Sequence, residues 1–204
     1  MQGKFITLEG IEGSGKSTNL KVVKAIFDRN KIDYVITREP GGGPLGPHLR
    51  KLLLDKDQSI SPSVEMLLMM ADRKDHVDNL IKPNLDKGIW VISDRYLDST
   101  IAYQGGGRQL DINLITSLSA ALKLPSPDFT LLFDLPVDVA LQRAEERSEL
   151  DRFEREPKDF HSRIRDSYLE LASNNHRIRT VDSSKDIESV SMQVEKYLTD
   201  FINA

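Results

Sequence analysis

The sequence of 204 residues contains no cysteine, and this absence excludes disulfides, thiolate zinc sites and cysteine nucleophiles. It also lacks an apolar run of membrane-spanning length, and its first residues lead directly into a strand-like run. We therefore expect no signal peptide, no membrane partner and a cytoplasmic location. An excess of basic residues is missing too. The net charge is -4, which argues against nucleic acid as a partner.

What the chain does contain is enough apolar surface for one folded domain, 1–204. Hydrophobic residues make up 39% of it and charged residues 29%, so it should fold rather than stay disordered. One long helix should begin at Ser61-Pro62 and end at Pro83. The hydrophobic pattern predicts strands at 5–9, 34–37, 89–93, 129–134 and 178–181, and helices between them, two of them at roughly 96–104 and 112–122. This alternation predicts an α/β fold: a five-stranded parallel sheet with helices on both faces and ligands beyond the carboxyl ends of the strands.

A glycine-rich motif follows the first predicted strand and opens the first helix. Residues 10–17 fit the pattern G-x-x-x-x-G-K-[ST], whose backbone amides cradle phosphate oxygens beside the positive end of a helix dipole. Lys16 would reach the β- and γ-phosphates, and the Ser17 hydroxyl would ligate magnesium. The predicted nucleotide-binding residues are Gly10, Ile11, Glu12, Gly13, Ser14, Gly15, Lys16, Ser17 and Thr18.

Two classes of protein use such a loop, and the sequence favours one of them. We find no aspartate–x–x–glycine switch in strand context and no asparagine–lysine–x–aspartate guanine reader. A kinase needs an acceptor site and a device that excludes water, because hydrolysis would otherwise compete with transfer. Candidates for both are present. An NTPase switch or motor stays the alternative.

The first acceptor candidates come directly after strands. Arg95 could hold an acceptor phosphate against the γ-phosphate, and Asp94 could orient a magnesium-bound water or the arginine. The alternative is an Asp94–Arg95 pair that ties strand to helix. Arg38, Glu39 and Pro40 follow the second strand in the same way.

Further candidates lie on predicted helices. Thr100, Tyr103 and Gln104 share a face with Tyr96, and the amide of Gln104 suits the edge of a pyrimidine base. Arg73 lies in the long helix 61–82, which is apolar on both faces and could meet the sheet, a ligand or a second subunit. A buried arginine needs an acceptor, either in a structural ion pair or on a ligand carbonyl.

A dense arginine run lies between two predicted helices. The phosphate loop carries no arginine, so positive charge for the transferring group should come from elsewhere. Arg143, Arg147 and Arg152 are the candidates, in or beside a lid at about 145–157. The alternative is a solvated charged face, which Glu145 and Glu146 support.

Together these segments resemble the thymidylate (dTMP) kinase family over essentially the whole chain. The matching segments are GIEGSGKST at 10–18, TREPGG at 37–42, ADRKDH at 71–76, DRYLDSTIAYQGG at 94–106, DRFE at 151–154 and VDSS at 181–184. The resemblance implies a nucleoside-monophosphate-kinase fold with a short arginine-rich lid. It also implies magnesium-dependent transfer of the γ-phosphoryl group of ATP to dTMP, and a homodimer. The rivals are a monophosphate kinase for another base and an ATPase whose arginine run serves a partner.

The resemblance implies a role for each matched position. The catalytic residues would be Lys16, Asp94, Arg95, Arg147 and Arg152, the magnesium ligands Ser17 and Asp94, and Arg143 would bind ATP together with the phosphate loop. The dTMP site would comprise Glu12 at the 3′-hydroxyl, Tyr103 at the 2′ position, Arg38 and Arg95 at the phosphate, Arg73, Thr100 and Gln104 at the thymine, with Glu39, Pro40 and Met69.

Four positions depart from the family pattern, and one of them is Thr100, which replaces a common serine. Met69 stands where the family often has a phenylalanine that stacks on the base, so we expect looser stacking. Gly43 replaces a threonine. Gly107 extends the glycine run, and nothing in the sequence explains it.

Overall fold

Five short strands form one parallel sheet in the computed structural model, which describes residues 3–147 and 150–204. The strands are β1 (Phe5–Glu9), β2 (Tyr34–Arg38), β3 (Trp90–Asp94), β4 (Phe129–Asp134) and β5 (Ile178–Asp182). Their order is β2-β3-β1-β4-β5, and every neighbouring pair is parallel. The predicted α/β class and five-stranded parallel sheet are confirmed, with β1 at the centre.

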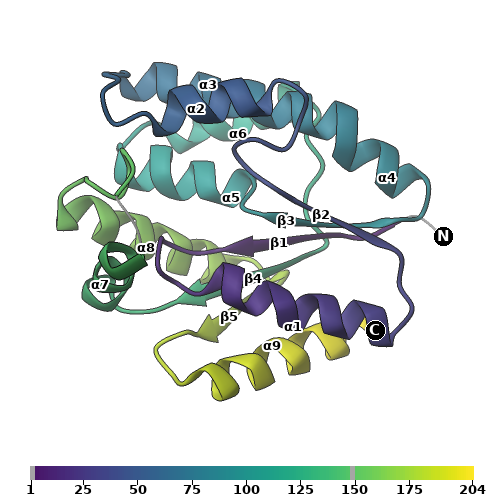
Figure 1. The fold of residues 1–204 in the computed structure, drawn as a ribbon. Coiled ribbons are helices and arrows are strands. Elements are labelled where there is room, and N and C mark those ends of the chain that lie inside the picture. The colour runs from purple at the N-terminus through teal and green to yellow at the C-terminus, as the bar shows by residue number, and fades with distance from the viewer. Residues whose placement is uncertain (1–2, 148–149) are drawn as a thin grey trace.

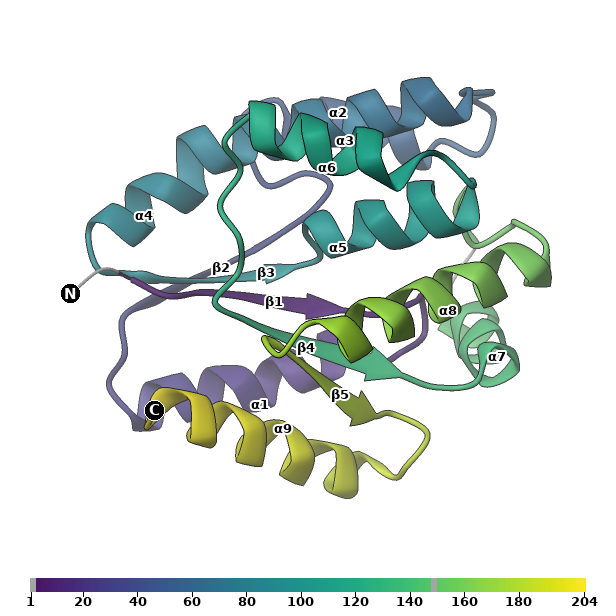
Figure 2. The same ribbon diagram turned by 180° about the vertical axis from the view of Figure 1, so that it is seen from behind.

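Helices cover both faces of the sheet, as Figures 1 and 2 show from opposite sides. The α-helices are α1 (Lys16–Arg29), α2 (Gly46–Leu54), α3 (Pro62–His76), α4 (Lys82–Asp86), α5 (Leu97–Thr100), α6 (Ile112–Ala121), α7 (Val137–Arg147), α8 (Lys158–Asn174) and α9 (Ile187–Ile202). Two segments are π-helical, η1 (Val77–Ile81) and η2 (Ile101–Gly107). Helices α1 and α9 lie side by side on one face, and the others cover the opposite face or extend beyond the strand ends. In the described ranges, no helix combines the length and hydropathy needed to cross a bilayer.

The core lies on both sides of β1, every residue of which is buried. Ile6 and Leu8 pack against α1 and α9 in one cluster, which includes Phe27. Phe5 packs on the other face in a cluster with Val77 of η1. Burial on both faces is what a central parallel strand requires, because helices cover both of its sides.

We predicted that the long helix ends at Pro83, and this prediction is wrong. The helical path runs on to Asp86, and the π-helical segment η1 immediately precedes the proline. Proline lacks an N–H, and in a regular α-helix its ring clashes with the carbonyl four residues earlier. The wider π turn relaxes that spacing, so the chain passes through the proline without breaking the helix.

Candidate active site

The phosphate loop connects the central strand β1 to α1, at the sheet edge where the predicted site should lie. Gly13 and Gly15 have positive φ angles of 72° and 87°. A Cβ atom on Gly13 would lie 2.2 Å from the carbonyl oxygen of Ala140, so the loop packs against α7 too closely for any side chain. The sequence pattern therefore reports a real backbone constraint.

Lys16 lies folded over the loop. Its ammonium group donates to the carbonyl oxygens of Gly10 and Ile11, both at 2.8 Å, and to Ser14 Oγ at 3.0 Å. Burial, helped by the positive charge of Arg95, lowers the pKa of Lys16 to about 8. Gly10 and Ile11 are themselves buried beneath the loop and do not line the cavity above it.

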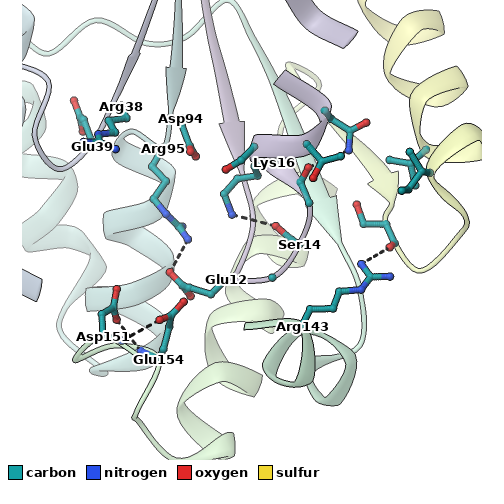
Figure 3. Close-up of a pocket in the computed structure, with 18 of the residues that line it drawn as sticks. Glu12, Ser14, Lys16, Arg38, Glu39, Asp94, Arg95, Arg143, Asp151 and Glu154 are labelled. Atoms are coloured by element: carbon teal, nitrogen blue, oxygen red, sulfur yellow. Dashed lines mark hydrogen bonds and ion pairs between the residues drawn. The ribbon is translucent and has the colours of Figure 1, made fainter. Parts of the chain in front are cut away.

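A cavity of about 580 Å³ opens above the loop (Figure 3). The rest of the predicted nucleotide-binding set lines it, from Glu12 to Thr18, and Arg143 joins from α7. The cationic side chains on its walls are Lys16, Arg38, Arg50, Arg95, Arg143 and Lys185. Carboxylates line the cavity as well, namely Glu12, Glu39, Asp94, Asp151 and Glu154, so a polyanion would have to contact the cations individually. Our reading of the sequence missed Arg50 and Lys185, because nothing in their spacing distinguishes them from surface charges.

Arg95 directly follows β3 in a strained conformation, with a φ of 73°. For a non-glycine residue this region is uncommon and is often found at functional sites. The guanidinium group donates to Glu12 Oε1 at 2.7 Å and more weakly to Ser99 Oγ at 3.2 Å. It lies 5.0 Å from the ring centre of Tyr103. Its ion-pair partner is thus Glu12 on the phosphate loop, rather than Asp94 as in the structural alternative.

Glu12 joins the phosphate loop to the acceptor side. Its carboxylate accepts from Arg95 and, at 2.5 Å, from the hydroxyl of Tyr103. Burial alone would raise the pKa of Glu12, but the charges of Arg95 and Lys16 outweigh it and lower the pKa below its ordinary value. The carboxylate is therefore charged, and it orders two predicted dTMP residues around itself.

Asp94 and Ser17 face the same cavity. Asp94 Oδ1 is buried and has no hydrogen-bond partner in the described part of the chain, and Ser17 is exposed. Within that part there is no group of three or more histidine, aspartate or glutamate side chains that could hold a metal by themselves. A cation here would need ligands from a bound phosphate and from water.

A second cavity of about 80 Å³ adjoins the first. All the predicted dTMP residues except Arg38 line it: Glu12, Glu39, Pro40, Met69, Arg73, Arg95, Thr100, Tyr103 and Gln104. Arg38 lines the larger cavity. Glu12, Glu39 and Arg95 line both, so the two cavities meet at the strand ends.

Arg73 forms a buried ion pair, one of the two roles that its sequence left open, and it also lines the small cavity. It is 1% exposed, and its Nε donates to Glu39 Oε2 at 2.7 Å in a buried ion pair. Its Nη1 donates to Thr100 Oγ1 at 2.8 Å and its Nη2 to the Tyr96 carbonyl at 2.9 Å. The other Glu39 oxygen lies 2.8 Å from His76 Nδ1. The guanidinium is therefore fixed at the wall of the small cavity. The Tyr96 side chain lines neither cavity, and its ring centre lies 5.2 Å from the central carbon of the Arg73 guanidinium.

The three lid arginines have different positions. Arg143 lines the large cavity and donates to the Ser183 carbonyl at 3.1 Å. The side chain of Arg147 lies outside the described residues, as do positions 148–149 of the predicted lid. Arg152 donates to Glu65 Oε2 at 2.6 Å and to the Leu53 carbonyl at 2.9 Å. The structure does not bring Arg152 to the phosphate cavity, contrary to our expectation, because Glu65 holds it elsewhere.

The sheet order and this pair of cavities define a class of protein. A phosphate loop after the central strand, next to an arginine-lined acceptor pocket, is typical of P-loop nucleoside-monophosphate kinases. A family model described as thymidylate kinase matches residues 8–194. The thymidylate kinases of Carboxydothermus hydrogenoformans and Nitrosomonas europaea are 48% and 44% identical to the chain. The match to the Carboxydothermus protein covers 97% of this chain and 98% of the relative, and the match to the Nitrosomonas protein covers 98% of this chain and 94% of the relative.

A solved structure of a thymidylate kinase has a similar fold. The crystal structure of thymidylate kinase from Ehrlichia chaffeensis matches with a TM-score of 0.77 and 35% identity, over 98% of this chain and 99% of that one. The chain belongs to the thymidylate kinase family. It is an ATP-dependent phosphotransferase that converts dTMP to dTDP in dTTP synthesis. The predicted family and reaction are confirmed.

Proposed function

We propose that the large cavity binds ATP, that the small cavity binds dTMP, and that the γ-phosphoryl group passes between them where Glu12 and Arg95 line both. The single observation that carries this assignment is the shared wall. With both substrates bound in this way, an acceptor phosphate held by Arg95 would lie next to a phosphate chain held by the loop and Lys16. The protein then supplies position and charge, with no covalent intermediate.

On the ATP side, the residues from Gly10 to Thr18 form the cradle. Lys16 neutralises the β- and γ-phosphates, and Arg143 approaches from α7. Arg147 follows Arg143 by one helical turn and joins it as a lid arginine. Lys16 must exchange its carbonyl contacts within the loop for phosphate oxygens, and the anionic phosphates favour its charged form.

On the dTMP side, Arg38 and Arg95 hold the phosphate, and Glu12 accepts from the 3′-hydroxyl. Tyr103 fills the space that a 2′-hydroxyl would need. At the other end of the cavity, Arg73 donates to a carbonyl of the thymine, beside Thr100, and Gln104 reads its neighbouring edge. Glu39 and Pro40 complete the wall, and Met69 contacts the ring through its polarizable sulfur.

The residues present fit a magnesium ion. A serine hydroxyl and one carboxylate with an unpartnered oxygen, Ser17 and Asp94, are a small set of hard oxygen ligands. Magnesium prefers this situation, because it keeps several waters and binds substrate phosphates. Ser17 and Asp94 would hold the ion, which would neutralise charge on the phosphates when bound.

We also propose a homodimer. Val64 and Leu67 of α3 are 48% and 52% exposed. The apolar face of the helix that carries these two residues is therefore not buried within this chain. Ile112 and Leu114 of α6 are also exposed. Sedimentation velocity tests the assignment, and a single species at 23.1 kDa would contradict it. A cytoplasmic location stays a prediction.

A coupled ATP assay with dTMP, dUMP, CMP, AMP or no acceptor tests the function. We expect transfer to dTMP well above the others, and ATP loss without an acceptor would favour an ATPase. Within the site, Arg95→Met should lower kcat more than it raises KM. Arg29→Met is the matched control, because Arg29 is 60% exposed at the far end of α1 and pairs with Glu195. Equal changes in kcat and KM for Arg95→Met would contradict its assignment to the transition state.

A further inference from the structure

Glu65 is a fully buried carboxylate on α3 that lies behind the proposed base site. Its side chain is 0% exposed and lines neither cavity. A buried carboxylate is costly unless charged or polar partners surround it. Nothing in the proposed chemistry so far uses it.

Its partners connect the base site to the lid. Glu65 Oε1 accepts from Gln104 Nε2 at 2.8 Å and from Arg108 Nε at 3.2 Å. Glu65 Oε2 accepts from Arg108 Nη2 at 3.1 Å and from Arg152 Nη1 at 2.6 Å. Oε1 thus meets the side chain proposed to read the base together with one guanidinium group, and Oε2 is held by two guanidinium groups.

The chemistry of these groups fixes how Gln104 is oriented. An amide side chain has a donor end and an acceptor end, whereas a carboxylate can only accept. Gln104 must therefore turn its Nε2 toward Glu65. Because Gln104 lines the small cavity and Glu65 does not, the amide oxygen is the group that it offers to a base.

A pyrimidine edge distinguishes the two possible orientations of that amide. Thymine presents a ring N–H donor at N3 beside the O4 acceptor, whereas cytosine presents an acceptor at N3 beside an amino donor. An amide oxygen from Gln104 next to the Arg73 donors matches thymine or uracil at both positions and mismatches cytosine at both.

We propose that Glu65 is a specificity-determining positioning residue, which sets the amide of Gln104 to accept the N3–H of the acceptor base. The inference rests on the proposed role of Gln104 in the dTMP site. It also gives Arg152 a different role from the one that its sequence suggested. In this structure Arg152 lies outside the phosphate cavity. It donates to Glu65 from the lid side. Arg108 donates to Glu65 as well, and its Nη1 donates to Glu156 Oε1 at 2.6 Å.

The substitution Glu65→Gln gives a directional test, because the two arginines decide how the new amide lies. The Oε2 position receives two guanidinium donors, at 2.6 and 3.1 Å, whereas the Oε1 position receives one, the Nε of Arg108 at 3.2 Å. Guanidinium groups can donate only, so the amide oxygen should stay at the Oε2 position. The new amide nitrogen then lies at the Oε1 position, facing Gln104. Gln104 must turn its oxygen toward it and its nitrogen toward the base. The variant should lose discrimination against cytosine.

The measurement is kcat/KM for dTMP and for dCMP, in the wild-type chain and in Glu65→Gln. We expect the dTMP to dCMP ratio to fall by about tenfold or more, as a mispaired polar group in a binding site predicts. The ratio is taken within one protein sample, so loss of folded protein cannot change it. Glu156→Gln is the matched control, because it removes a charge from the same network without facing Gln104, and its ratio should equal the wild-type ratio. Glu65→Asp keeps an acceptor-only group and should retain most of the selectivity.

The Gln104→Leu variant separates the two levels of the proposal. If it lowers the ratio and Glu65→Gln does not, Gln104 reads the base but Glu65 does not set its orientation, and the inference is overturned. If Gln104→Leu leaves the ratio unchanged, the base site itself is wrongly assigned and the inference falls with it. Equal losses of kcat/KM for both acceptors in Glu65→Gln would also overturn it, because they would show a purely structural role.

Discussion

Replacing Glu9 by glutamine should flatten the dependence of stability on pH. Glu9 is the last residue of the central strand and is 1% exposed. Its carboxyl accepts from the Tyr96 N–H at 2.8 Å, the Ser99 hydroxyl at 2.6 Å and the Tyr168 hydroxyl at 3.0 Å. Burial, followed by the negative charge of Asp98, raises the pKa of Glu9 from 4.5 to about 7.

The sign of the effect follows from that direction. Between pH 4.5 and about 7 the folded chain keeps a proton on Glu9 that the unfolded chain has lost. The resulting stabilisation is fully present below pH 4.5 and is lost as the pH rises through about 7. Each pH unit in this window lowers the free energy of unfolding by about 1.4 kcal/mol, or roughly 3 kcal/mol over the window.

Glutamine has no proton to lose in this range, and it fits the same three donors. Its oxygen can accept from the Tyr96 N–H, and its nitrogen can donate to the hydroxyl of Ser99 or Tyr168, either of which can turn. The variant should therefore fold with the same contacts. It should lack only the slope that the buried carboxyl contributes.

Urea unfolding between about pH 5 and pH 8 measures the free energy of unfolding for both chains. The difference between Glu9→Gln and the wild type should grow in favour of the variant as the pH rises. Glu188→Gln is the control, because it removes an exposed carboxyl at the start of α9 and should keep the wild-type slope. Parallel curves for the wild type and Glu9→Gln would refute the reasoning.

Three further predictions concern single positions. Lys16→Met should lower kcat by about 10²–10³-fold in the coupled assay, because it removes a cation from the transferring phosphates; a change confined to KM would contradict this. Gly107→Ala should lower the free energy of unfolding by about 1–3 kcal/mol, since its Cβ would lie 2.6 Å from the Phe160 ring. Thermal unfolding measures the loss of stability, and an unchanged midpoint would contradict the prediction by showing that the Phe160 ring moves aside without cost. Met69→Phe should lower KM for dTMP if the methionine stacks loosely, and an unchanged KM would contradict that idea.

The sequence predicted those features whose signal is local. The phosphate loop is one, because its glycines report positions where no Cβ atom fits, such as Gly13 against Ala140. The strands β1, β3 and β4 are another, since their apolar runs reflect burial on both faces. Gly43 and Gly107 look like departures in the sequence. In the fold, Gly43 lies too close to Asp75 and the backbone of His76 for a side chain.

The features that the sequence did not predict depend on distant contacts. Arg152 lies in an arginine run, but the run does not show that its partner Glu65 lies 87 positions away. Glu65 itself had a weak signal, because it stands four and eight residues before Met69 and Arg73 on one helical face. The path through Pro83 was missed because a π turn has no clear sequence pattern.

The central position of β1 also constrains how the chain can fold during its synthesis. Of the five strands in this sheet β1 is made first, yet its neighbours are β3 and β4 rather than β2. The whole segment from β1 to the end of β4 must therefore leave the ribosome before the strand that carries the phosphate loop is paired on both sides. Until then its apolar side chains and unpaired backbone are available to other chains, which makes this interval the period of greatest exposure to aggregation.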